Sequence, residues 1–292
     1  MSNAITLASQ FVPVLDEIYK LASLTAKLDG NPDLAKAGAN ANELIIPKLS
    51  MQGLGAYSRN SGYVAGDVTL TNETVTCNFD RGRMFTVDTL DNMETAGIAF
   101  GRLAGEFIRT KVVPELDAFR FATYCGITGI STAAAAVLST GADVITALRA
   151  ATNKMDEDEV PYEDRHLFIT PTLMGLVQDL DTTKSKEVLS RFASQTLVPQ
   201  TRFYTAIDQY DGTTSGETAG GYIKDATSGK NINFMVLQKS ALIQFEKHIA
   251  PKIITPEMNQ AADAYKFGYR NVGIADAYEN KVAGIYLHKS TT

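Results

Sequence analysis

The sequence predicts an α+β fold, and three observations carry this prediction. The longest helical pattern begins near Asp91, from which apolar or small residues recur at three- and four-residue steps as far as Val112. Runs rich in β-branched residues occupy 43–49 and 67–77, and 165–169 reads as a buried strand. The length of 292 residues allows one large or two modest domains with a real core.

Composition and charge exclude several classes of protein. A net charge of −6 argues against a fold that grips duplex DNA through its phosphates. Cys77 and Cys125 are too few for a disulfide scaffold and indicate a reducing compartment. The chain does not open with the charged and apolar regions of a secretory leader, so we expect no export. Arg102, Glu106 and Arg109 interrupt the apolar runs of the long helix, so we expect no membrane span.

The long helical pattern indicates its own boundaries. Asp91 can cap the helix, and Glu94, three residues later, completes a capping box. Before Pro114 the pattern covers about 22 residues, roughly 33 Å at 1.5 Å per residue, and Pro114 followed by Glu115 can start a second segment. We therefore expect a long helix that is kinked or broken at Pro114.

Three glycines, Gly97, Gly101 and Gly105, lie along one row of this helix. Each costs up to about 1 kcal/mol relative to alanine, which suggests that another element packs closely along the row. Ordinary packing of a helix on the sheet of its own domain is the favoured alternative.

This stretch resembles a known family. Its strand carries Asp-Arg-Gly-Arg-x-Phe at 80–85, an Asp-rich turn follows, and the helix reads AFGRLAGEFIRTKVVPELDAFRFA at 99–122. These motifs are similar to those of the major capsid proteins of tailed bacteriophages with the Hong Kong 97-type fold. The resemblance implies a Hong Kong 97-type capsid fold with a long spine helix, peripheral and axial domains, an extended β-hairpin loop and an N-terminal arm.

The resemblance also implies domain boundaries. We expect the arm at 1–48, the hairpin loop at 49–79, the peripheral domain with its spine helix at 80–126 and 256–292, and the axial domain at 127–255.

The expected arm contains an amphipathic stripe at 14–28, after Pro13, which predicts a helix lying on a partner surface. A helix packed on its own domain is the alternative. Residues 31–42 are rich in Ala, Asn and Gly and predict a tether. Because little sequence precedes the hairpin, the resemblance implies a separate scaffolding protein.

The hairpin tip at 53–66 is rich in Gly and Tyr and poor in aliphatic residues. A lone two-stranded ribbon is only marginally stable in water, so we expect the hairpin to lie on a neighbouring subunit. The Gly-Leu-Gly at 53–55 is no phosphate loop, because no Lys-Ser/Thr and helix start follow it.

Five residues form the expected set of contacts between subunits: Tyr57, Arg59, Asp80, Arg81 and Arg83. Guanidinium groups bind carboxylates bidentately, so the charged residues before the spine helix can lock adjacent subunits. Ion pairs within one subunit are the alternative.

Three further segments are interpreted from composition. The acidic run at 156–159 is read as a solvated surface, because no EF-hand spacing supports a cation site. Residues 208–231 are turn-forming with little to bury, which predicts a mobile surface loop. Residues 240–247 are read as a short helix.

No catalytic, cofactor or metal site is predicted. His166, His248 and His288 are scattered, and the sequence contains no HExxH, GxSxG, P-loop or paired-cysteine motif. Some capsids of the resembling family join subunits covalently through Lys and Asn. Lys48 and Asn271 are present here, but no local motif assigns them those roles.

The resemblance implies a structural major capsid protein that self-assembles into the icosahedral head around the double-stranded DNA of a tailed phage. Expected partners are further copies, as pentamers and hexamers of a closed shell, a separate scaffolding protein, a portal, and packaged DNA bound without sequence specificity, with no membrane. The expected location is the virion, after assembly in the bacterial host cytoplasm. An encapsulin-like compartment is the alternative, and a cytosolic enzyme is a more distant one.

Overall fold

The computed structural model describes residues 23–30, 36–37, 43–94, 98–180 and 182–292. Most of the expected arm, with the greater part of the predicted helix at 14–28 and of the tether at 31–42, lies outside these residues. No helix in the described ranges is long and apolar enough to cross a bilayer.

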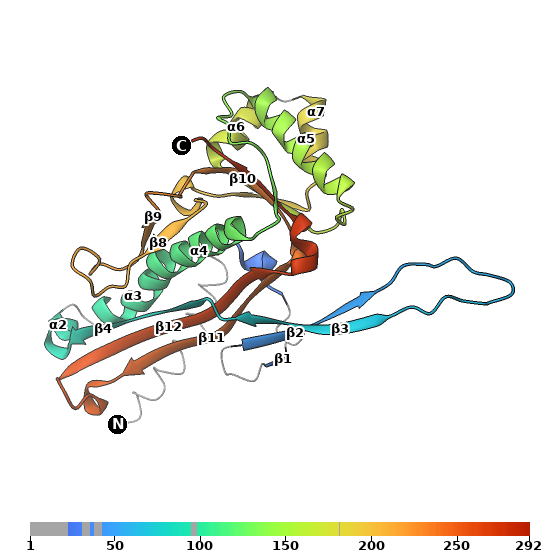
Figure 1. The fold of residues 1–292 in the computed structure, drawn as a ribbon. Helices are drawn as coiled ribbons and strands as arrows, with labels where there is room; N and C mark the ends of the chain where they lie inside the picture. Colours follow the sequence, from blue (N-terminus) through green and yellow to red (C-terminus); the bar gives the residue numbers. More distant parts are fainter. Residues whose placement is uncertain (1–22, 31–35, 38–42, 95–97, 181) are drawn as a thin grey trace.

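A five-stranded sheet lies at one end of the molecule, between three helices on one face and a long central helix on the other (Figure 1). Leu167 and Ile169 pack beneath the three helices, whereas Phe168 between them packs with Phe121 of the central helix. The strands, in order across the sheet, are β5 (Ser131–Thr132), β13 (Ile285–Lys289), β10 (Ile232–Gln238), β6 (Arg165–Ile169) and β7 (Ser194–Leu197), and the helices are α5 (Gly141–Glu157), α6 (Pro171–Leu180) and α7 (Thr183–Ser190).

A second sheet, long and antiparallel, packs on the other part of the central helix. Its order is β11 (Leu242–Ile254), β12 (Ala264–Ala277) and β4 (Phe79–Asp88). Phe267 and Tyr269 of β12 are buried against Ile108 and Val112 of the helix. Gly82 in β4 permits the strand pairing, because a Cβ atom there would lie 2.7 Å from the carbonyl oxygen of Tyr269.

The central helical run begins earlier than the sequence predicts. Its first segment is α2 (Thr89–Glu94), and the backbone N–H of Leu90 donates to Asp88 Oδ1 at 2.9 Å. The capping box of Asp91 and Glu94 is therefore wrong, because the chain has already turned at Asp88, where β4 ends.

Pro114 does not break the helix. Segment α3 (Ile98–Phe107) continues through a π-helix (Ile108–Val112) into α4 (Val113–Gly126). Proline lacks an N–H, and its ring would clash with the carbonyl of Thr110 in a regular α-helix, so one wider turn accommodates it. Of the glycine row, Gly97 lies outside the described residues.

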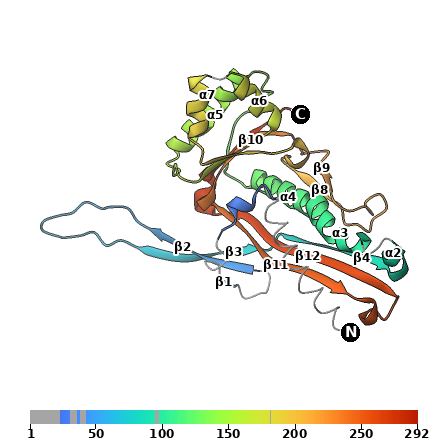
Figure 2. The ribbon, with the colours of Figure 1, turned by 180° about the vertical axis from the view of Figure 1, so that it is seen from behind.

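The extended hairpin is present, and it projects from the body in both views (Figures 1 and 2). Ile46 and Val75 fix its base against Ile243 and Ile274. Its sheet has the order β1 (Lys36–Ala37), β2 (Glu43–Met51) and β3 (Val68–Thr76).

Two segments differ from the sequence-based expectation. The stretch 208–231 is turn-rich as predicted, but it also contains a short hairpin, in which β8 (Ile207–Gln209) pairs with β9 (Tyr222–Lys224). The expected helix at 240–247 is wrong: Leu242 and Ile243 pack into different clusters on opposite sides of β11, as successive residues of a strand do. Short 3-10 helices complete the chain: η1 (Ala26–Leu28), η4 (Gln200–Arg202), η5 (Lys239–Ala241), η6 (Pro256–Met258) and η7 (Glu279–Gly284).

Sheet pairing bears on the expected domain boundaries. Strand β11 falls in the range expected for the axial domain, yet it pairs with β12 beside the central helix. Strand β13 falls in the expected peripheral range, yet it pairs with β10. The division into peripheral and axial domains stays a prediction. By its pairing, β11 would belong to the peripheral part and β13 to the axial part.

Candidate assembly surfaces and cavity

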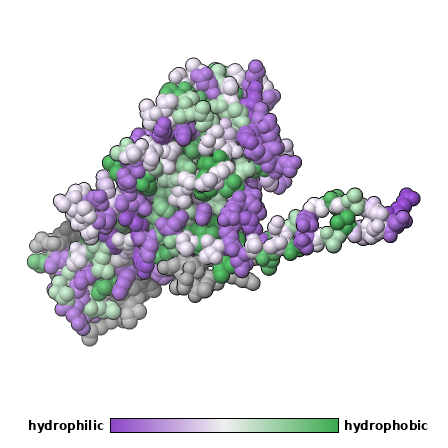
Figure 3. Space-filling model, viewed as in Figure 1, coloured by the Kyte–Doolittle hydropathy of each residue, from purple (hydrophilic) through white to green (hydrophobic). Residues whose placement is uncertain are grey.

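The projecting hairpin is amphipathic. Leu49 pairs with Leu70 and Met51 with Val68 across the ribbon, and these four side chains are 55%, 67%, 65% and 68% exposed. Pairs on the alternate face, such as Ser50 with Thr69, are polar. Apolar and polar groups therefore occupy opposite faces, and the green residues along the projecting arm in Figure 3 mark the apolar stripe.

Tyr57 and Arg59, expected to contact another subunit, lie at the tip of this ribbon. The rings of Tyr57 and Tyr63 meet edge to face, with centroids 4.9 Å apart. Arg59 lies in the turn that Ser58 and Gly62 close through a β-bridge, and it is exposed. The tip thus presents aromatic rings and a cation to solvent, and the contact with a second subunit stays a prediction.

An ion pair ties the base of the ribbon to the body. Lys48 Nζ lies 2.8 Å from Glu279 Oε2. Burial, and then the charge of Glu279, raise the pKa of Glu73 nearby, and burial raises the pKa of Asp276. Carboxyl groups thus outnumber lysine at the base of the ribbon. The ion pair with Glu279 engages Lys48 within its own chain.

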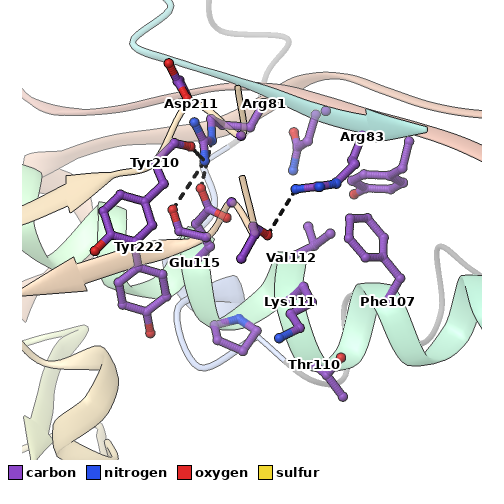
Figure 4. A pocket seen from close by; sticks show the side chains of 18 of the residues that line it. Arg81, Arg83, Phe107, Thr110, Lys111, Val112, Glu115, Tyr210, Asp211 and Tyr222 are labelled. Carbon is purple, nitrogen blue, oxygen red and sulfur yellow. Dashed lines mark hydrogen bonds and ion pairs between the residues drawn. The ribbon is translucent and has the colours of Figure 1, made fainter. Parts of the chain in front are cut away.

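The three charged residues expected to lock subunits all make contacts within the chain. Asp80 holds Arg270 through two hydrogen bonds of 2.6 and 2.8 Å, and these hold the pKa of Asp80 below its ordinary value. Arg81 and Arg83 point from the opposite face of β4 toward the central helix and the β8–β9 hairpin (Figure 4). The structure thus shows pairing within the subunit, the alternative considered above, and a role between subunits stays a prediction.

The two arginines hold the β8–β9 hairpin. Arg81 donates to Glu115 Oε1 at 2.8 Å and to the carbonyl oxygen of Tyr210 at 2.7 Å. Arg83 donates to the carbonyl oxygens of Ala219 and Thr218 at 3.0 and 2.9 Å. Gly220 has a φ of +66°, and a Cβ atom there would lie 2.6 Å from Arg83 Nη1, so the turn requires glycine to accept the guanidinium group.

A cavity of about 950 Å³ lies between this hairpin, β4, β12 and the π-helical turn (Figure 4). Asn271 lines it and is fully buried, and neither atom of its amide has a hydrogen-bond partner among the described residues. Burial raises the pKa of Glu115 on the facing wall, although Arg81 opposes the shift. The cavity therefore combines apolar walls with polar groups that water or a ligand can satisfy.

Sequence reasoning did not find this cavity. Its only local signal is a polar residue, Asn271, in the otherwise largely apolar face of β12. The three histidines lie apart: His166 contacts Ser194, His288 contacts Asn233, and His248 is exposed on β11. Within the described ranges, no group of three or more His, Cys, Asp or Glu side chains could hold a metal ion.

The chain shares its fold with solved capsid structures. It is similar to a structure from Gordonia phage Cozz, with a TM-score of 0.60, 12% identity, and 92% of this chain and 87% of that chain covered. The capsid of Myoviridae phage XM1 gives a TM-score of 0.53 and 12% identity over 92% of each chain. A virus-like particle from Pyrococcus furiosus gives 0.53 and 10% identity over 95% of this chain and 99% of that chain. No protein-family model and no curated protein matches the sequence.

Proposed function

We propose, on the premise that this chain has the fold of capsid proteins, that it is the building block of a closed protein shell. One observation carries the proposal: the ribbon projects from the body and exposes the apolar stripe of Leu49, Met51, Val68 and Leu70. Contiguous exposed apolar surface of this kind marks a protein interface. A second copy is the partner that a shell provides, and it would cover the stripe along the ribbon.

Among shells, we favour the icosahedral head of a tailed phage that encloses double-stranded DNA. Support comes from the resemblance at 80–85 and 99–122 and from phage structures of the same fold. The net charge of −6 suits a wall that repels the phosphates of packaged DNA and makes no sequence-specific contact with it. In this proposal the copies form pentamers and hexamers, with a separate scaffolding protein and a portal, and assemble in the host cytoplasm into the virion.

A protein compartment of the encapsulin type is the second candidate. The similarity to the Pyrococcus furiosus virus-like particle supports it, because that likeness covers 95% of this chain and 99% of that chain. Both candidates give the chain a structural role and no catalytic one. They differ in what the shell encloses.

Imaging and nuclease protection test the proposal together. Negative-stain micrographs of the purified protein should show closed particles of uniform size. If only monomers or small oligomers form with and without a crowding agent, and after co-expression with neighbouring phage genes, the shell function is wrong. Particles from infected or induced cells that protect long double-stranded DNA from nuclease would select the phage head. Particles that enclose protein instead would select the compartment.

A further inference from the structure

The cavity of about 950 Å³ beneath the β8–β9 hairpin has the size and the lining of a small-molecule site (Figure 4). Such sites measure roughly 300–1,000 Å³ and combine apolar walls with a few polar groups in fixed positions. We propose that this cavity binds a small aromatic phosphate, which is a planar ring that carries a phosphate group. The binding of this ligand is independent of the proposed shell function.

The lining supplies cations that can receive an anion. Arg83, Lys111 and Lys224 line the cavity, and in the described part of the chain none of the three has an ion-pair partner. Arg83 donates to the carbonyl oxygens of Ala219 and Thr218, which use two of its five N–H donors. A phosphate group offers these cations a charged acceptor, and charge-assisted hydrogen bonds are about twice as strong as neutral ones.

The acidic side chains of the lining already have donors of their own. Glu115 pairs with Arg81 at 2.8 Å, and Asp80 pairs with Arg270 at 2.6 Å. Asp211 accepts two backbone N–H groups of the turn that follows it, at 2.7 and 2.8 Å. Because each carboxylate is engaged in this way, the remaining cations give the cavity a positive potential.

Aromatic side chains form the wall next to these cations. The centroid of the Phe107 ring lies 4.8 Å from that of Phe85 and 6.2 Å from that of Tyr269. Figure 4 shows Arg83 reaching from β4 into the space over Phe107 and Val112 of the central helix. A planar ring packs favourably on aromatic side chains, and its phosphate can then meet the guanidinium group.

The amide of Asn271 lies at the closed end of the cavity. Asn271 is 0% exposed, whereas Arg83 and Lys111 are exposed. Neither Nδ2 nor Oδ1 of Asn271 has a hydrogen-bond partner among the described residues, although an amide can donate two hydrogen bonds and accept two. Polar atoms on the edge of a ring can satisfy this amide directly or through one water. The order of cations, aromatic wall and amide matches a nucleotide more closely than a plain aryl phosphate.

Four probes test the site on the unaltered full chain: adenosine monophosphate, phenyl phosphate, adenosine and inorganic phosphate. Calorimetry measures binding, and thermal melts accompany it, because a ligand that binds only the folded chain raises the melting temperature. We expect adenosine monophosphate, phenyl phosphate or both to bind at least tenfold more tightly than adenosine or inorganic phosphate. If neither aromatic phosphate binds at millimolar concentration, or if inorganic phosphate binds as tightly, the proposal is overturned.

Two variants connect binding to the cavity. Lys111→Gln removes an exposed cation and should weaken the binding of the aromatic phosphates at least fivefold, with the melting temperature of the free protein unchanged. Phe107→Leu should weaken their binding while leaving any weak binding of inorganic phosphate as it was. Lys184→Gln, an exposed change on α7 outside the cavity, is the control. Unchanged affinity in both Lys111→Gln and Phe107→Leu would place the probes elsewhere and overturn the proposal.

Asn271→Leu distinguishes the two sources of an aromatic phosphate. If adenosine monophosphate binds at least tenfold more tightly than phenyl phosphate and loses this advantage in Asn271→Leu, the ligand is a nucleotide whose base is recognised by the amide. If the two probes bind equally and Asn271→Leu changes neither, the cavity takes simple aryl phosphates. Both results support the site, and the calorimetry with Lys111→Gln decides whether it exists.

Discussion

Arg81 Nε lies 2.8 Å from Glu115 Oε1, so β4 is tied directly to the central helix at the first turn of α4. The same guanidinium group donates to the carbonyl oxygen of Tyr210 and thereby ties both elements to the β8–β9 hairpin. One side chain therefore joins three segments that are far apart in the sequence. We expect the relative positions of these segments to depend on it.

Neutralising the arginines tests this role. Arg81→Gln with Arg83→Gln should lower the free energy of unfolding by about 1–3 kcal/mol, because Glu115 loses its charged partner and three hydrogen bonds to backbone carbonyls are lost. Hydrogen exchange should rise in residues 207–224. Arg109→Gln, which breaks an exposed pair with Glu106, is the control and should cost only tenths of a kcal/mol.

Particle yield from the same double variant addresses the predicted role between subunits. Unchanged stability and exchange with lost assembly would show that the arginines act on a neighbouring subunit. Lowered stability with normal particles would restrict them to the contacts seen within the chain.

The pH dependence of stability should contain a contribution from Glu115. Burial raises its folded-state pKa above the unfolded value, so the folded state binds the proton more tightly. The resulting stability is fully present below the unfolded pKa of about 4.3 and is lost as the pH rises through the folded pKa. Relative to Glu115→Gln, the wild-type subunit should therefore gain free energy of unfolding as the pH falls from about 7 to about 4.

Urea denaturation of both proteins at several pH values measures this difference. Glu106→Gln, an exposed change on the same helical rod, is the control. If the free energy of unfolding of the wild type instead falls relative to that of Glu115→Gln as the pH is lowered, Arg81 rather than burial controls the pKa of Glu115.

Asn271 offers a test of the cavity. Asn271→Leu removes two buried polar atoms that lack partners among the described residues, so it should keep or raise the free energy of unfolding, by up to about 1–3 kcal/mol. Asn233→Leu is the matched control: its amide donates to the carbonyl oxygen of Ala136 at 2.8 Å, and its loss should be destabilising by a similar amount. Equal destabilisation by both changes, seen in thermal melts, would show that Asn271 binds ordered water or a ligand.

Local sequence patterns predicted the elements that local physics determines. The three- and four-residue period located the central helix, and the β-branched runs on either side of a Gly- and Tyr-rich tip located the hairpin. The start of the helix was missed because Asp88 and Asp91 are both competent caps, and only the end of β4 distinguishes them. Strand β11 was missed because Leu242 and Ile243 face two different cores, which only the tertiary structure creates.

Among the candidate contact residues, position could be predicted but pairing could not. Tyr57 and Arg59 are at the ribbon tip as expected, since a turn between two strands must place them there. The partners of Arg81 and Arg83 include backbone carbonyls more than 120 residues away, and any sequence supplies a carbonyl at every position. The hydrogen bonds of residues 23–30 with Asp117 and Gln244 could likewise not be predicted, because these two residues come together only after α4 packs on β11.

The central claim is that the ribbon serves assembly rather than the fold of the subunit. Replacing residues 49–70 with Asn-Gly removes the tip together with the apolar stripe of Leu49, Met51, Val68 and Leu70, and it leaves the cluster of Val75, Ile243 and Ile274 at the base intact. Closure entropy changes slowly with loop length, so the subunit should tolerate the shorter turn. An interface of standard size buries about 1,600 Å², and its loss should prevent association at ordinary concentrations.

Sedimentation velocity of the shortened protein, beside a thermal melt, measures this claim most directly. The account predicts a subunit or small capsomer that melts cooperatively near the wild-type temperature and never sediments as a closed particle. Normal particles from the shortened chain would contradict the assembly role of the ribbon, and an unfolded chain would show that the ribbon belongs to the core of the subunit.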